Sequence, residues 1–137
     1  MTAKEYMDQV QKAGQELEIL AAKKRHYIDL MQSIGAKMDK VAAVGNTFGS
    51  SKTETAAVGL VELAEQIDKK IGEYTKTIKE AEALIDKLPQ EKFRAILTYK
   101  YLCNLSWRTI RDKMDYKDEK SVFACHRYAL KALQGLM

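Results

Sequence analysis

A long heptad pattern constrains this chain more than any other feature. From about Ala3 to Ala43, residues on one helical face recur at alternating steps of four and three positions, which is the spacing of a coiled-coil seam. Lys24 is the one charged residue in this seam, where it either sets the register or extends past the edge into water. The pattern predicts one helix of about 40 residues. The seam positions are Tyr6, Val10, Ala13, Leu17, Leu20, Lys24, Tyr27, Met31, Ile34, Met38 and Val41.

A second seam predicts that this helix folds back as an antiparallel hairpin. It runs from about Glu54 to Leu88, and residues 44–54 between the two seams lose the periodicity and collect Gly, Ser, Thr and Asn, as a loop does. Two glycines precede Lys52 and Thr53, but their spacing does not match a phosphate-binding loop and no hydrophobic strand comes before them. The second seam contains Leu60, Ala64, Ile67, Ile71, Tyr74, Ile78, Ala81, Ile85 and Leu88.

Further apolar residues lie beside the two seams and predict a second contact face. A two-helix hairpin buries little surface and is marginal alone. We therefore expect residues 1–88 to form a homo-oligomer or to pack against another protein. The additional apolar residues include Met7, Ile19, Ala21, Ile28, Leu30, Leu63 and Leu84.

Pro89 marks the predicted boundary between two domains, 1–88 and 89–137. Proline disfavours helical geometry in the residue before it and suits the start of a helix. The next helix is predicted from Gln90 to about Cys103, with Asn104 ending it in a left-handed turn. Its packing residues are predicted to be Phe93, Ile96, Leu97 and Tyr101, with Tyr99 or Lys100 at the margin.

The C-terminal stretch predicts a helix-turn-helix. Ser106 can cap a short helix whose buried face holds Trp107, Ile110 and Met114. Residues 115–118 (Asp-Tyr-Lys-Asp) form a turn, and its last residue can cap a helix from Glu119 to about Gln134. The apolar stripe of that helix is Val122, Cys125, Ala129 and Leu133. The predicted fold class is all-α: a long antiparallel coiled-coil hairpin followed by a small three-helix helix-turn-helix domain.

The positive charge belongs to the predicted helix-turn-helix domain. Residues 89–137 contain 10 Lys and Arg against 5 Asp and Glu, whereas residues 1–88 contain 13 against 14. A basic domain on a neutral scaffold is typical of proteins that bind nucleic-acid phosphates.

These motifs resemble a known group of proteins. Ser106-Trp107, Ile110, Met114, Val122 and the Ala129-Leu130-x-x-Leu133 pattern are similar to the C-terminal helix-turn-helix region of bacterial sigma factors. The whole chain resembles small phage-encoded proteins of Gram-positive bacteria, which are grouped with late-gene transcription activators of the RinA and ArpU kind. Two positions depart from the pattern: Asp115 stands where the family usually has Gly, and Arg111 where it usually has a small residue.

Two sets of residues are candidates for DNA contact on this plan. The candidates for base contact in the major groove lie early in the second helix of the motif and are Glu119, Lys120, Ser121, Ala124 and Arg127. The candidates for phosphate contact are Ser106, Arg108, Arg111, Lys113, Lys117 and Lys131. For any one of these residues, a purely solubilising role is an equally simple explanation.

No enzyme site is predicted. His26 and His126 are far apart in sequence, and adjacent Cys125 and His126 point about 100° apart on a helix, so no metal site is expected. We expect no catalytic residues, no cofactor and no small-molecule substrate. Cys103 and Cys125 are expected to be small buried residues in a reducing compartment. The absence of a long apolar run predicts no membrane partner and a cytoplasmic protein.

The leading hypothesis is a phage-type, sigma-like transcription regulator that binds double-stranded DNA through residues 89–137. The coiled coil would dimerise the protein or dock it on host RNA polymerase. One alternative is a small terminase-like subunit that recognises phage DNA for packaging, and another is a helical protein adaptor that does not bind DNA.

Overall fold

Helices joined by short connections make up the part of the protein that its computed structural model describes. The backbone is described for all residues except 45–49, and the side chains for residues 1–34 and 55–137. The helices are α1 (Ala3–Val44), α2 (Ser50–Asp86), α3 (Glu91–Leu97), the π-helical turn η1 (Thr98–Leu102), α4 (Trp107–Lys113) and α5 (Glu119–Leu136). The described backbone contains no strand, so the predicted all-α class is confirmed. None of the described helices combines the length and apolar character needed to cross a membrane.

The chain divides into two compact units. Unit 1 contains Met1–Glu16 and Tyr74–Met137, and unit 2 contains Leu17–Glu73. Both α1 and α2 therefore contribute one segment to each unit. The predicted domain boundary at Pro89 falls inside unit 1, and the division into domains 1–88 and 89–137 stays a prediction.

The two long helices follow the heptad pattern closely, but the predicted loop was too long. The first helix ends at Val44, one residue beyond its predicted end, whereas α2 begins at Ser50, four residues before the predicted start at Glu54. Residues 50–54 contain no Gly or Pro, so nothing in their backbone chemistry prevents the helix from starting early. The rest of the predicted loop, residues 45–49, lies outside the described residues.

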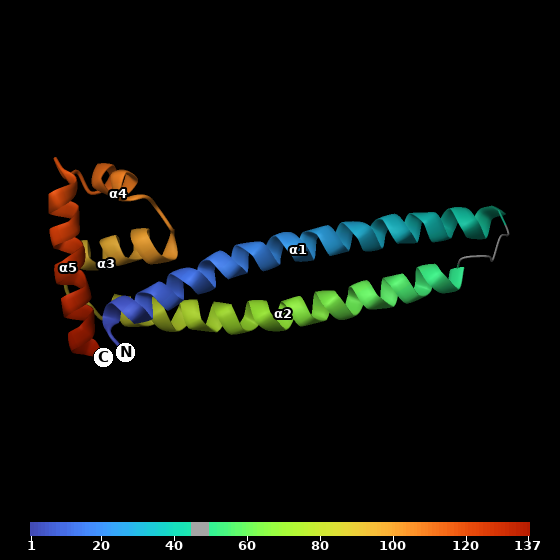
Figure 1. The fold of residues 1–137 in the computed structure, drawn as a ribbon, viewed down its shortest axis with the longest axis horizontal. Helices are drawn as coiled ribbons and strands as arrows, with labels where there is room; N and C mark the ends of the chain where they lie inside the picture. The colour runs from blue at the N-terminus through green and yellow to red at the C-terminus, as the bar shows by residue number, and fades with distance from the viewer. Residues whose placement is uncertain (45–49) are drawn as a thin grey trace. The chain divides into compact units, whose positions relative to one another are not determined.

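One continuous core holds unit 1 together. It joins α1 residues Ala3, Met7 and Val10 to α2 residues Ala81 and Ile85 and to the buried side chains of the C-terminal helices. Within this unit α5 lies across α3, and the two chain ends lie close together (Figure 1). The remaining buried members of the core are Leu88, Ile96, Leu97, Tyr101, Ile110, Val122, Cys125, Ala129 and Leu133.

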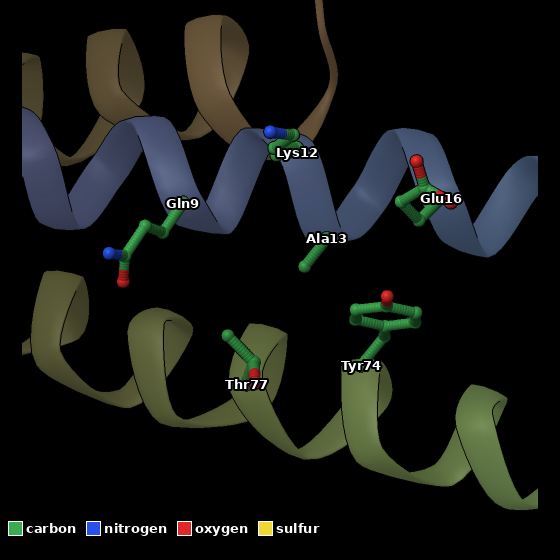
Figure 2. Close-up of a pocket in the computed structure, with 6 residues that line it drawn as sticks. All are labelled: Gln9, Lys12, Ala13, Glu16, Tyr74 and Thr77. Atoms are coloured by element: carbon green, nitrogen blue, oxygen red, sulfur yellow. The ribbon is translucent and has the colours of Figure 1, made fainter.

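The α1 and α2 segments of unit 1 run antiparallel, as Figure 2 shows. Residues 9 to 16 of α1 advance in the same direction along the figure as residues 77 to 74 of α2. Small side chains at Ala13 and Thr77 leave a groove of about 340 Å³ between the helices, and Tyr74 stands from α2 toward Glu16. Small side chains at a contact between helices leave space unfilled, which larger side chains would occupy.

Unit 2 contains the charged seam residue. Lys24 of α1 forms an ion pair with Asp68 of α2, with Nζ 2.5 Å from Oδ1. Both side chains are about half exposed, so the pair adds little to the free energy of unfolding. The ion pair lies between facing turns of α1 and α2, and whether Lys24 sets the register of the two helices stays a prediction.

The helix predicted from Gln90 to Cys103 begins as expected but changes type before its end. Gln90 is its N-cap, and residues 98–102 form a π-helical turn in which the Cys103 N–H donates to the Thr98 carbonyl at 2.9 Å. Asn104 has φ 55°, so the predicted left-handed end is confirmed. The expectation that Cys103 is buried was wrong, because the wider π turn rotates its side chain to the solvent.

Candidate nucleic-acid interface

Helix α4 begins at the residue that the sequence predicted. The Ser106 hydroxyl accepts a hydrogen bond from the Thr109 N–H at 3.2 Å, which satisfies one of the free donors of the first turn. Ile110 is fully buried in the core, and Trp107 and Met114 are half-buried beside it. The short helix is therefore held by its cap and by one buried face.

The turn after α4 holds the second helix in place. Asp115 has φ 57°, a left-handed conformation that Asp tolerates better than most residues. Asp118 is the N-cap of α5, and its carboxylate accepts from both the backbone N–H and the hydroxyl of Ser121, each at 2.9 Å. These two hydrogen bonds lower the pKa of Asp118, which keeps the cap ionised.

The predicted apolar stripe of α5 is confirmed. All four of its residues are buried, and α5 packs with this stripe against α3 and α4. The buried stripe fixes the rotation of the helix about its axis. The opposite face must consequently point away from the core.

The face opposite the stripe carries the strongest DNA-contact candidates. Lys120, Ala124, Arg127 and Lys131 follow each other at steps of four, three and four residues, so they share one side of α5. The three cations are exposed, and Ala124 between them is half-buried. Because Ala124 is small and lies between cations, this side of α5 leaves room for the negatively charged DNA to approach the helix closely.

The two remaining base-contact candidates lie at the start of α5. Glu119 is exposed in the first helical turn. The Ser121 hydroxyl donates to Asp118, so it retains only acceptor capacity for another partner. Ser121 therefore takes part in the cap of α5 through its hydrogen bonds to Asp118. The sequence analysis did not assign this role to it.

The phosphate-contact candidates differ in how free their polar groups are. Arg108, Lys113, Lys117 and Lys131 are exposed cations, and Lys113 Nζ lies 5.9 Å from the ring centre of Tyr99. Arg111 donates to Asp112 through both Nε and an Nη nitrogen, at 3.2 and 3.1 Å, so part of its charge is already paired. The Ser106 hydroxyl is used by the cap of α4.

A hydrogen-bonded pair of rings, buried Tyr101 and half-buried His126, supports the motif, and the sequence analysis missed it. The Tyr101 hydroxyl lies 2.6 Å from His126 Nε2, and the Trp107 ring lies edge-on to His126. Burial, with the nearby charges of Lys4 and Lys100, lowers the pKa of His126 from 6.5 to about 4, although Asp8 opposes this shift. A neutral imidazole with its proton on Nδ1 can accept a hydrogen bond at Nε2 from the Tyr101 hydroxyl.

The N-terminus of α1 also contacts the motif, through contacts that no local pattern indicates. The Ala3 N–H donates to Gln134 Oε1 of α5 at 2.6 Å, and the Gln11 side chain donates to the Lys100 carbonyl at 3.0 Å. These contacts join residues 131 and 89 positions apart in the chain. Because they depend on the folded arrangement alone, the spacing of residues along the sequence could not have revealed them.

Two other residues complete the description of this surface. Phe123 is 44% exposed and lies edge-on to Trp107, with ring centres 5.2 Å apart. Phe123 therefore borders the cationic face, where it can make an apolar contact to a base or to a protein.

The described residues contain no group of three or more His, Cys, Asp or Glu that could hold a metal ion.

Comparison with known proteins places the chain in a family. The sequence profile of a family described as a protein of unknown function, DUF1492, matches residues 30–134. The chain belongs to the DUF1492 family. The DUF1492 match includes all of α2 and the helix-turn-helix except the last two residues of α5, so the caps and the cationic face lie within the shared region. No curated protein matches the chain, and no solved structure matches it.

Proposed function

We propose that this protein is a phage-type transcription regulator that binds double-stranded DNA with α5 in the major groove. The single observation that carries this proposal is the exposed face of α5, with Lys120, Arg127 and Lys131 on one side of a helix capped and buried on the other. A basic recognition helix held by a shorter helix is the arrangement of helix-turn-helix proteins. The excess of positive charge in residues 89–137 supports the same reading.

A second component of the proposal is self-association through residues 1–88. A domain of about 50 residues makes few base contacts, so useful affinity requires two half-sites or a tether. The long helices offer the surface for a second copy. Docking on host RNA polymerase is the alternative use of the same helices.

The experiment is a binding titration of the purified protein with random duplex DNA over a salt series. The Lys120→Ala/Arg127→Ala double variant is expected to bind roughly 10-fold to 100-fold more weakly than wild type at about 100 mM salt, and with a shallower salt slope, since two phosphate or base contacts are lost. Lys76→Ala/Lys79→Ala is the matched control. It removes the same charge from exposed positions of α2, and should change the affinity little.

The possible results separate the alternatives. Equal weakening in both double variants would mean that net charge, and not the α5 face, controls binding. No binding by wild type even at about 50 mM salt would contradict the DNA-binding proposal and favour the protein adaptor. Binding by a ring larger than a dimer would favour the terminase-like subunit.

A further inference from the structure

Phe123 is an exposed aromatic side chain on the helix proposed to bind DNA. It is 44% exposed and lies outside the buried stripe of α5, which is complete without it. Single exposed apolar residues are common on protein surfaces, so exposure alone assigns no role to Phe123. The position and the surroundings of the ring decide what it contacts.

The position of Phe123 places it among the base-contact candidates. Lys120 lies three residues before it and Arg127 four residues after it, so the three side chains share one side of α5. Both cations are exposed. A DNA groove that receives Lys120 and Arg127 therefore also receives the phenyl ring between them.

An aromatic cluster holds the ring in place. The Trp107 ring of α4 lies edge-on to Phe123, with ring centres 5.2 Å apart and an angle of 82° between the ring planes. Trp107 also lies edge-on to His126, and Lys100 Nζ lies 4.6 Å from the Trp107 ring centre. These contacts restrict the rotation of Phe123 before any partner binds, so the side chain loses less conformational freedom on binding.

The chemistry of a phenyl ring limits which base it prefers. The ring has no hydrogen-bond donor or acceptor, and polar groups that lose water against it gain no new partner. Among the four bases of DNA, only thymine presents a methyl group in the major groove. A phenyl ring held in that groove therefore gains most from a contact with thymine.

We propose that Phe123 contacts the C5-methyl group of thymine in the major groove and gives the protein a preference for an A·T pair at that position. The inference rests on the proposed binding of duplex DNA by α5 and names a residue that determines its sequence preference. Positive charge attracts a duplex of any sequence, whereas the methyl contact distinguishes one base from another.

The test compares the affinity of the full chain for two duplexes that differ only in this methyl group. Both consist of A·T pairs in the same mixed order, and in the second every thymidine is replaced by deoxyuridine. Deoxyuridine lacks the C5-methyl group and keeps the hydrogen-bonding groups of thymidine. Wild type is expected to bind the thymidine duplex about 4-fold more tightly for each methyl group contacted, which is the effect of burying one such group.

Variants of α5 make the test specific to one ring. Phe123→Ala should bind the two duplexes with equal affinity, whereas Phe123→Leu keeps an apolar side chain and should retain a preference for thymidine. Tyr128→Ala is the matched control and should keep the wild-type ratio. Tyr128 is 55% exposed and lies five residues beyond Phe123, about 140° around the axis of α5. Circular dichroism checks that each variant is helical.

The outcomes separate this inference from the proposed function. A thymidine preference that is lost in Phe123→Ala and kept in Tyr128→Ala supports the methyl contact. Equal wild-type affinity for the two duplexes, or a preference that persists in Phe123→Ala, would overturn the methyl contact and leave DNA binding in place. No binding of either duplex at about 50 mM salt would contradict both proposals.

Discussion

The pairing of Tyr101 and His126 joins two elements of the motif through one hydrogen bond. Tyr101 is 1% exposed, so its hydroxyl needs the hydrogen bond to His126 to avoid an unpaired buried polar group. With the neutral ring protonated on Nδ1, a second proton on His126 would remove the acceptor at Nε2 and add a positive charge near Lys4 and Lys100. The pair therefore couples the packing of η1 against α5 to the protonation of one imidazole.

This coupling predicts a specific loss of stability at low pH. The pKa of His126 is about 4 in the folded protein and near 6.5 when unfolded, so its contribution is complete above pH 6.5 and is lost as pH falls toward 4. After allowance for solvent screening, the loss is roughly 2 kcal/mol. His126→Gln should reduce the change in unfolding free energy between pH 7 and pH 4 by that amount.

The matching control for the pH experiment is the exposed His26. The substitution His26→Gln removes an imidazole at an exposed position outside this pair, and so controls for the loss of a histidine side chain. Both variants and wild type are compared by urea unfolding at the two pH values. Carboxylates also titrate in this range, but their contribution to the change in unfolding free energy is shared by all three proteins and cancels in the comparison. An unchanged pH dependence in His126→Gln would contradict the account of the pair.

At the scale of the helix, the start of α5 depends on a single cap. Asp118→Ala removes the acceptor for the Ser121 N–H and should lower the free energy of unfolding by about 1 kcal/mol. Asp118→Ser keeps a side-chain acceptor at the same position and should retain most of that stability. Urea unfolding of both variants at pH 7 measures the difference. No loss in Asp118→Ala, or an equal loss in Asp118→Ser, would contradict the stabilising role of the side-chain acceptor.

The helices themselves could be predicted from the sequence, because the signals that define them are local. The seams, the caps at Ser106 and Asp118 and the left-handed Asn104 each depend on residues within a few positions of one another. The early start of α2 and the π turn at residues 98–102 were missed. Ser50 and Thr98 are residue types that occur in both helices and loops. They therefore give no local signal for a helix start or for a π turn.

The candidate site was predictable in part for the same reason. The rotation of α5 follows from its apolar stripe, so the exposure of Lys120 and Arg127 could be anticipated. The support for that helix could not, because Tyr101 and Ala3 contact it from other elements through the tertiary fold. Hydrophobic periodicity indicates which side of a helix is buried and gives no information on which distant residue covers it.

At the scale of the whole molecule, different parts of the chain have different proposed tasks. Unit 1 carries the cationic face proposed for DNA. Self-association through residues 1–88, as proposed, would hold two of these motifs in one noncovalent complex. Linked motifs bind two half-sites more tightly than either motif alone, since the second binding step is intramolecular.

The most direct measurement of the central claim is an NMR titration of the isotope-labelled full chain with a short duplex. The account predicts that the backbone amide shifts concentrate in α5 between residues 119 and 131, with smaller changes in α4 and in the turn at 114–118. Residues 74–86 of α2 serve as the internal reference and should change little. Shifts spread evenly along the cationic residues of the whole chain, or confined to α1 and α2, would contradict recognition of DNA by the exposed face of α5.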